Sequence, residues 1–301
     1  MPASSTSCYG VPAVIDLHAH TSCSDGSETP TELVALAAKI GLKAVAVTDH
    51  DSVDGIPEAL AAGRRYGVEV VPGVEIPLEF ESFTLDMLGY FLCGVPSEEF
   101  RAQLEKLRHS RDERNVRILQ ILGELGYPLQ PAELAQVAGG EAVGRPHIGE
   151  AMRRHGYVQT ISEAFERFLR RGAPAYVDRR RLGLAPAVRL IRESGGVAVI
   201  AHPGIIRTDH AGLRRLVREA ARLGVVGMEC SYPLYDEETE QRCRALAAEF
   251  GLVPTGGSDF HGSVKPAAHL GQGAGGRPIP DELLDQLRER CESAERPAEQ
   301  T

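Results

Sequence analysis

The sequence has no tryptophan and little aromatic character, and lysine is scarce. Aromatic residues make up 5% of the 301 residues, and only four of the 33 basic residues are lysines. No uninterrupted apolar run is long enough for a membrane-spanning helix, which needs roughly eighteen such residues or more. The first residues, MPASSTSCYGVPAV, lack both the basic start and the apolar stretch of a secretory signal. These absences argue against a membrane protein and against secretion.

The six cysteines are scattered, and none forms a C-x-x-C pair. This pattern predicts unpaired thiols in a reducing cytoplasm. The net charge of −9 argues against nucleic-acid binding through a uniformly basic surface. The charge is uneven, because residues 101–181 hold 15 Lys and Arg against 10 Asp and Glu, which leaves −14 on the rest of the chain.

Short apolar runs alternate with helical patterns over most of the chain. The run TPTELVALAAKIG (29–41) is typical of a helix, with Thr29 as its N-cap, Pro30 in the first turn, Glu32 at N3 and Gly41 at its end. Regular alternation predicts parallel strands in a sheet or barrel. We expect seven strands, at 14–18, 43–50, 68–75, 83–91, 197–202, 225–231 and 252–259.

Residues 97–181 interrupt this alternation. This segment reads as helical throughout and is too long for a loop in a compact domain. We expect a barrel formed by 14–96 and 182–290, with 97–181 as a helical insertion that caps one face. Residues 1–13 and 291–301 are expected to be tails.

Most of the expected strands end on a histidine or an acidic residue. Imidazole and carboxylate groups are ordinary ligands for Zn, Mn and Fe. Because the carboxyl ends of barrel strands meet at one rim, residues far apart in sequence can share one site. One such histidine is as readily a polar loop residue, but the repetition predicts a metal centre. Its candidate ligands are His18, His20, Asp25, His50, Glu75, His202, Asp259 and His261.

The motifs H-x-H-x4-D, TDHD, PGVE, AHP and SDFH, in this order, resemble those of the PHP (polymerase and histidinol phosphatase) superfamily. The resemblance covers nearly the whole chain outside 97–181. It implies an α/β fold, a distorted (β/α)7 PHP barrel, with two or three divalent ions (Mn²⁺, Zn²⁺ or Fe²⁺) at its rim. The chain looks most like stand-alone PHP phosphoesterases with a helical insertion.

The resemblance also divides the ligands among three metal positions. The first takes His18, His20, Glu75 and Asp259, the second takes Glu75, His202 and a residue of the fourth strand, and the third takes Asp25, His50 and His261.

The fourth strand departs from the family pattern. Relatives usually have a histidine where TLDMLGY has Asp86. One interpretation is that Asp86 supplies an oxygen ligand and favours a harder metal such as Mn²⁺. The alternatives are a dinuclear site with a weakened second metal, or an ordinary strand residue, although an acid in an apolar run is costly unless it has a partner.

Two or more ions can lower the pKa of a bridging water and hold phosphoryl oxygens, so a metal-bridged hydroxide is expected to attack phosphorus. We assign the catalytic roles to Asp25, His50 and Glu75. Either Asp25 or a metal-bound water is the candidate general acid.

The segments GRPHIGEAM and PAYVDRRR are similar to segments that reach the substrate phosphate in this branch of the family. They make Arg145 and His147 candidate phosphate ligands. Arg179, in the second segment, and Arg207, outside both, are weaker candidates. Alternatively, Arg145 caps a carbonyl group and His147 is simply the first-turn residue of a helix.

The resemblance predicts a phosphoesterase that removes phosphate from small nucleotides, either nucleoside 3′,5′-bisphosphates or AMP. The alternative is a 5′-3′ exoribonuclease acting on short RNA 5′ ends, which needs stacking platforms that the spacing of the aromatic residues does not indicate. A histidinol phosphatase, an amidohydrolase and a non-catalytic PHP module fit less well. No strand ends on the lysine that commonly bridges the metals of amidohydrolases. We expect a cytoplasmic enzyme without an obligate protein partner.

Overall fold

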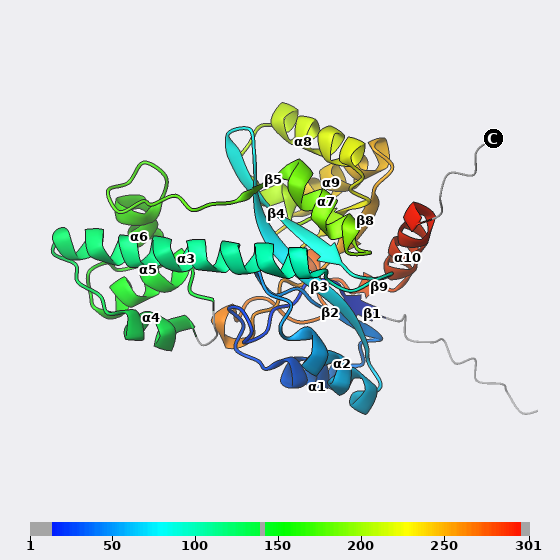
Figure 1. The fold of residues 1–301 in the computed structure, drawn as a ribbon, viewed down its shortest axis with the longest axis horizontal. Helices are drawn as coiled ribbons and strands as arrows, with labels where there is room; N and C mark the ends of the chain where they lie inside the picture. The colour runs from blue at the N-terminus through cyan, green and yellow to red at the C-terminus, as the bar shows by residue number, and fades with distance from the viewer. Residues whose placement is uncertain (1–13, 139–141, 296–301) are drawn as a thin grey trace, which may run out of the picture.

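A sheet that closes almost into a barrel forms the centre of the molecule (Figure 1). The computed structural model describes residues 14–138 and 142–295. The expected N-terminal tail with Cys8, and the end of the expected C-terminal tail, lie outside these described residues.

Within the described residues the sheet has nine strands. They are β1 (Val14–Asp16), β2 (Ala44–Val47), β3 (Glu69–Phe80), β4 (Phe83–Tyr90), β5 (Leu182–Gly183), β6 (Val197–Ile200), β7 (Gly227–Ser231), β8 (Val253–Gly256) and β9 (Ile279–Pro280). The α-helices are α1 (Pro30–Ile40), α2 (Ile56–Tyr66), α3 (Glu98–Glu124), α4 (Pro131–Ala138), α5 (Arg145–Arg154), α6 (Ile161–Ala164), α7 (Leu184–Glu193), α8 (His210–Leu223), α9 (Glu237–Glu249) and α10 (Glu282–Glu295). Shorter helical turns span Phe165–Leu169, Pro203–Ile205, Gly262–Val264 and Ala274–Gly276.

All seven expected strands are present, together with β5 and β9, which were not expected. The order is β8-β7-β6-β4-β3-β2-β1-β9, and β5 pairs with β3. The expectation of an all-parallel sheet is wrong at β4, which is antiparallel to both β3 and β6. Strand β3 continues beyond Glu75 to Phe80, and a two-residue turn leads directly into β4, so that Phe80 pairs with Phe83. A turn this short can join only antiparallel strands.

The helix expected over 29–41 is confirmed as α1. The Thr29 side chain accepts a hydrogen bond from the Glu32 backbone N–H, and the Glu32 carboxylate accepts one from the Thr29 N–H. Gly41 ends the helix in the left-handed conformation at φ 82°. A glycine suits this position because it has no Cβ to clash.

Two apolar cores lie on opposite faces of the strands, because side chains alternate between faces along a strand. The inner core contains Ile15, Leu88 and Val199, and α10 closes it with Leu284 and Leu287. Helix α10 extends to Glu295, so the expectation of a tail from residue 291 is wrong for 291–295.

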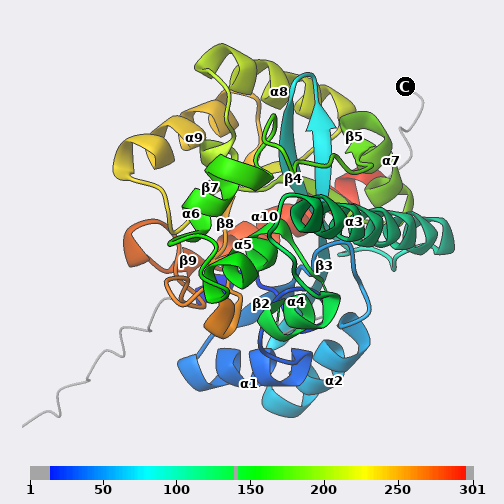
Figure 2. The same ribbon diagram turned by 90° about the vertical axis from the view of Figure 1, so that its left-hand side faces the viewer.

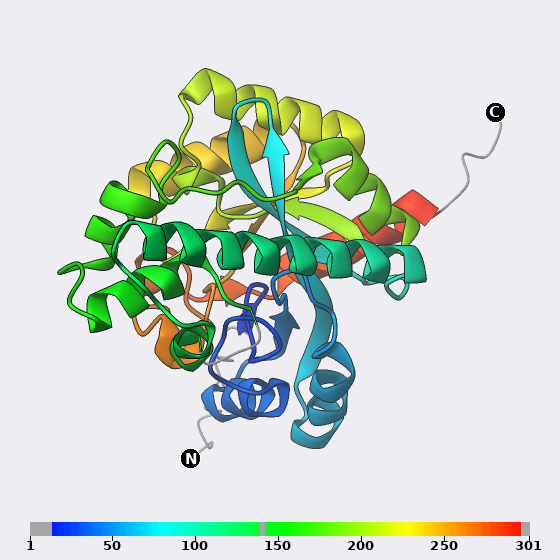
Figure 3. The ribbon, with the colours of Figure 1, turned by 60° about the vertical axis from the view of Figure 1, so that its left-hand side comes forward.

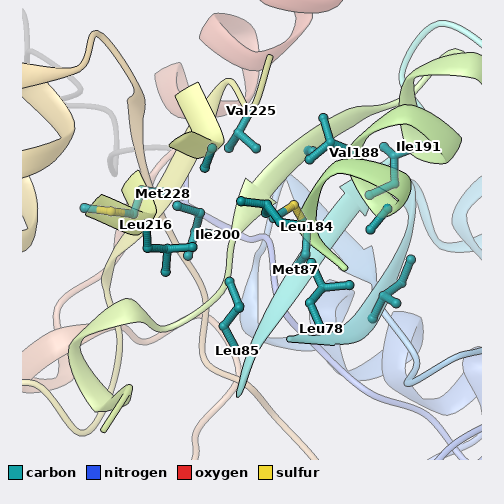
Figure 4. Packing of buried hydrophobic residues seen from close by; sticks show 14 of the residues in the cluster. Leu78, Leu85, Met87, Leu184, Val188, Ile191, Ile200, Leu216, Val225 and Met228 are labelled. Carbon is teal, nitrogen blue, oxygen red and sulfur yellow. The ribbon is translucent and has the colours of Figure 1, made fainter. Parts of the chain in front are cut away.

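The larger outer core lies between the sheet and α7, α8 and α9. Figure 4 shows part of it, where Leu184 and Val188 of α7 approach Met87 of β4 and Ile200 of β6. This packing holds the antiparallel strand β4 in the middle of the sheet.

The helices α3 to α6 lie beside the sheet, as Figures 1 and 2 show. Helix α3 runs across the front of the barrel in Figure 3, and its first half joins the barrel core through Phe100 and Leu104. Its second half belongs to a separate apolar cluster that includes Ile118, Ile148 and Phe168. A separate core is what a distinct cap needs, and the division into barrel and cap stays a prediction.

The expectation that all thiols are unpaired is wrong for Cys93 and Cys291. The structure joins them in a disulfide, with their Cα atoms 6.3 Å apart. They lie 198 residues apart in sequence, so no local pattern could signal the pairing. In the described part of the chain, no helix is both long and apolar enough to span a membrane.

The capping box predicts a measurable effect on stability. We expect Thr29→Ala to lower the free energy of unfolding by about 1 kcal/mol, because an N–H of the first turn loses its acceptor. Thr29→Ser keeps the hydroxyl and should stay close to wild type. Urea unfolding followed by circular dichroism measures both, and equal losses for Ala and Ser would contradict the role of the hydroxyl.

Candidate metal centre

The loops that follow the strand ends, together with β3 and β4, bring the predicted ligands into one cluster. Their side chains form a continuous set of contacts of 4.0 Å or less between nitrogen and oxygen atoms. The structure places together His18, His20, Asp25, His50, Glu75, Asp86, His202, Asp259 and His261.

Glu75 is the hub of this cluster and is only 1% exposed. Its Oε2 atom lies 3.3 Å from Nε2 of both His18 and His20 and 3.1 Å from Nδ1 of His50. Its Oε1 atom lies 3.0 Å from Nε2 of His202. Four histidines from three parts of the chain therefore converge on one carboxylate, which suits a shared metal ligand.

Three groups of donor atoms are compact enough to hold an ion, with every atom within 4.8 Å of the others in its group. They are His20, Asp25, His50 and His261; His18, Glu75 and His202; and His18, His20 and Asp259. These groups overlap with the three metal positions that the resemblance implies, but they differ in three ways. His20 joins the third position, His18 joins the second, and Glu75 is absent from the group that corresponds to the first.

The donor set fits divalent ions. The Nδ1 atom of His20 is buried and has no hydrogen-bond partner among the described residues, and a buried polar atom without a partner is costly. The Nε2 atoms of His18 and His20 lie 3.1 Å apart, so a shared cation suits them better than two ring protons. Mixed imidazole and carboxylate donors suit Zn, Mn and Fe.

The carboxylates make the site strongly electronegative. Burial lowers the pKa of His20, but Asp259 and Glu75 outweigh burial and raise that pKa to about 10. In the same way, Glu75 and Asp86 overcome burial and raise the pKa of His202 to about 9. A potential that favours a proton on buried imidazoles also attracts metal cations.

Asp86 lies at the edge of the cluster and is not part of the three compact groups. Its Oδ2 atom is 4.0 Å from Nε2 of His202. Burial and the nearby Glu75 carboxylate raise the pKa of Asp86 to about 6. The side chain is 30% exposed and lines the pocket beside the cluster, and its role as a metal ligand stays a prediction.

Two of the ligand positions have unusual backbone conformations. His202 and Asp259 adopt φ values of 27° and 52°. Positive φ is rare for residues other than glycine, and it persists at sites where the surrounding structure imposes it. At both positions the chain has just left a strand and turns the side chain into the cluster.

Sequence reasoning missed Glu229, which is fully buried in β7. Its Oε1 atom lies 3.2 Å from Nδ1 of His18, and its Oε2 atom accepts a 2.8 Å hydrogen bond from the backbone N–H of His202. A carboxylate on the far nitrogen of a ligand histidine orients the ring and strengthens it as a ligand. An acid inside the apolar strand VVGMECS was the available signal.

Asp16 and Tyr232 were missed as well. The buried Asp16 carboxylate accepts backbone hydrogen bonds from His18, Ser258 and Gly271, which ties the first strand end to the last. The Tyr232 hydroxyl donates a 2.7 Å hydrogen bond to Asp259, and Lys265 forms an ion pair with the same carboxylate.

A pocket of about 970 Å³ opens beside the cluster. Its wall includes the ligand candidates Asp86 and His202 and the predicted phosphate ligands Arg145 and Arg207. Phe165 and Tyr176 line it too, with the Arg145 guanidinium 5.9 Å and 5.4 Å from their ring centres. Stacking surfaces that the spacing of aromatic residues did not indicate therefore gather in one pocket.

The other two phosphate candidates make contacts within the protein. His147 is buried, and its Nδ1 atom accepts a 2.9 Å hydrogen bond from the Gly144 N–H at the start of α5. Arg179 forms a 3.2 Å ion pair with Asp51. Arg145 also donates a 3.2 Å hydrogen bond to the Leu169 carbonyl. The capping roles weighed for Arg145 and His147 are therefore present, and phosphate binding stays a prediction.

The model of the PHP domain family matches residues 16–169. The chain belongs to the PHP family. The match confirms the predicted family, its α/β barrel fold and the predicted enzyme class, a metal-dependent phosphoesterase.

Among PHP relatives, the chain is 32% identical over 246 residues to a 5′-3′ exoribonuclease of Haemophilus influenzae, covering 82% of this chain and 89% of the relative. It is also 32% identical over 259 residues to a 3′,5′-nucleoside bisphosphate phosphatase of Chromobacterium violaceum, covering 83% and 87%. A crystal structure described as a putative metal-dependent phosphoesterase from Bifidobacterium adolescentis superposes with a TM-score of 0.79 at 30% identity, covering 93% of this chain and 98% of that one.

The contact between Glu229 and the ring of His18 predicts an effect on metal affinity. We expect Glu229→Gln to weaken Mn²⁺ binding about 10- to 100-fold, because the variant removes the charge that orients His18. Titration calorimetry on the chelator-treated protein measures this affinity. Glu238→Gln, an exposed position on α9, is the matched control, and equal affinities in both variants would refute the support role.

Proposed function

We propose that this chain is a metal-dependent phosphomonoesterase that acts on small nucleotides, either nucleoside 3′,5′-bisphosphates or AMP. The observation that carries the proposal is the Glu75 hub of four histidines at the edge of an arginine-lined pocket. A metal centre beside cationic side chains suits an anionic phosphate ester.

The proposed metal ligands are the nine residues of the cluster, which hold two or three divalent ions. When bound, such ions supply Lewis-acid chemistry, in which they activate water and neutralise charge on the phosphoryl group. The chain's own part is to hold the ligand set in place. Glu75 would serve as a shared ligand and Glu229 would orient His18. The side chains of Asp25 and His50 are 18% and 22% exposed.

On the substrate side, we propose that Arg145 and Arg207 contact phosphate from the pocket wall, where both side chains lie. Arg179 forms an ion pair with Asp51, and His147 accepts a hydrogen bond at the start of α5, so we propose them as weaker phosphate contacts. Phe165 and Tyr176 offer apolar faces of the kind that a nucleobase stacks on.

A 5′-3′ exoribonuclease is the second candidate function. Two observations favour it: the size of the 970 Å³ pocket, and a second pocket of about 630 Å³ lined by His50 and Arg111 on another side of the cluster. A short RNA 5′ end would be the substrate in that case. We propose a cytoplasmic enzyme that needs no protein partner for either activity.

The first experiment measures phosphate release by the Mn²⁺-loaded protein. Adenosine 3′,5′-bisphosphate, AMP and a 5′-phosphorylated RNA oligonucleotide are assayed in parallel. We expect release from the small nucleotides and its loss after chelation with EDTA. Release of mononucleotides from the oligonucleotide would instead support the exoribonuclease, and no turnover of any substrate would refute both proposals.

We expect His50→Ala to reduce turnover by at least about a hundredfold. The loss of a metal ligand should reduce activity more than the loss of a residue, such as Glu229, that only orients a ligand. The matched control is His210→Ala, an exposed position at the start of α8. This variant should retain wild-type rates, and comparable losses in both would show that the effect is not specific to the cluster.

The oxygen donor at Asp86 leads us to propose Mn²⁺ as the preferred ion. Asp86→His introduces the histidine of the family pattern and should shift the preference from Mn²⁺ towards Zn²⁺ or Fe²⁺. Metal analysis after competition between equal concentrations of Mn²⁺ and Zn²⁺ measures this shift. Asp86→Asn removes the charge alone, and an unchanged metal ratio in the His variant would exclude Asp86 as a ligand.

A further inference from the structure

The two side-chain oxygens of Asp259 have different surroundings. Its Oδ1 atom lies 3.4 Å from Nε2 of His20 and 3.7 Å from Nε2 of His18, the two histidines of its compact donor group. Its Oδ2 atom contacts Tyr232 and Lys265, neither of which is a proposed ligand. One oxygen of the carboxylate therefore faces a metal position, and two protein groups hold the other.

Tyr232 contacts Oδ2 from a closely packed position. The residue directly follows β7 and is 2% exposed. The centre of its ring lies 5.3 Å from the ring centres of both His202 and Tyr235. Its hydroxyl donates a 2.7 Å hydrogen bond to Oδ2 of Asp259. Because close packing leaves the ring little room to move, the hydroxyl holds this oxygen in one place.

Lys265 reaches the same oxygen from the loop after β8. The helical turn Gly262–Val264 precedes it, and a 2.9 Å hydrogen bond ties this turn to the loop after β1. The Lys265 ammonium forms an ion pair with Oδ2 of Asp259 and donates a 3.2 Å hydrogen bond to the Tyr232 hydroxyl. The ammonium also lies 5.6 Å from the centre of the Tyr232 ring. The three groups therefore hold one another in a closed set of contacts.

An ammonium group beside a metal ligand repels the cation that the ligand would bind, so its position matters. A carboxylate binds a divalent ion through one oxygen or through both. A catalytic metal site keeps one coordination position open for water or substrate. The donors on Oδ2 compete with an ion for that oxygen, and the Lys265 contact is the stronger kind because it is charge-assisted.

We infer that Tyr232 and Lys265 are positioning residues that hold Oδ2 of Asp259, so that this carboxylate offers a metal ion Oδ1 alone. A coordination position then stays open for water or substrate. The inference rests on the proposed function, because it concerns the same metal centre. It gives Lys265 an effect opposite to that of Glu229, since Glu229 strengthens a ligand and Lys265 restricts one. Removal of Lys265 should therefore tighten metal binding and slow turnover.

The test combines Mn²⁺ binding with turnover, using the full chain. Calorimetry on the chelator-treated protein should show that Lys265→Met binds Mn²⁺ about tenfold more tightly, because a repelling charge is gone and Oδ2 is free. With saturating Mn²⁺, kcat for the nucleotide that wild type hydrolyses should fall about tenfold or more, because the second oxygen occupies the open position. A role in folding alone would lower affinity and turnover together, and that result or an unchanged affinity would overturn the inference.

Further variants separate the two contacts. Lys265→Arg keeps the charge and should restore most of the wild-type affinity and kcat. Tyr232→Phe keeps the packed ring and removes only the hydroxyl, so both changes should have the same direction but a size of about two- to fivefold. The matched controls are Lys39→Met on α1 and Tyr66→Phe on α2, two exposed positions. Both should behave as wild type.

Because Mn²⁺ binding is measured without substrate, this inference and the proposed function can fail separately. If wild type binds Mn²⁺ but hydrolyses no substrate, the proposed function fails, and the affinity of Lys265→Met still decides whether Oδ2 is held. If wild type hydrolyses nucleotides and Lys265→Met binds Mn²⁺ no more tightly, the inference fails alone. Circular dichroism checks that each variant is folded, and Tyr232→Phe decides the outcome if Lys265→Met does not fold.

Discussion

The site depends on one buried carboxylate, Glu75, and on its contacts with four histidines. A carboxylate at 1% exposure is stable only when opposite charge or hydrogen-bond donors surround it. Here the surrounding groups are imidazoles from β1, β2 and β6, so the strand ends must meet at one rim. The nearly closed sheet satisfies this requirement, and its inner core, closed by α10, holds the strands at fixed positions.

The same principle of charge balance explains what lies around the hub. Acidic groups exceed cations within the cluster of ligands, which raises the pKa of His20 and His202. A short way off, Arg111 and Arg179 pair with the buried Asp51 carboxylate. The acidic groups among the ligands suit metal cations, and arginine side chains beside them suit an anionic phosphate ester.

Much of the fold was predictable because its signals are local. The capping box at Thr29 and Glu32 and the seven strands depend on residues within one element, and all are confirmed. The antiparallel strand β4 was not predictable, since it follows from the length of β3 and a two-residue turn that the alternating pattern did not reveal. The pairing of Cys93 with Cys291 joins distant segments and leaves no local signal.

The sequence by itself determined which residue types stand at the strand ends, and hence the family, the enzyme class and the nine candidate ligands. Only the tertiary structure decided which atoms meet. It brought Glu229 behind His18 and placed Arg111 and Arg179 against the buried Asp51. The physical reason is that spacing along a chain governs local geometry alone. Contacts between distant residues depend on how the sheet closes, and so the partners of Glu229, His18 and His202, were not visible in the sequence.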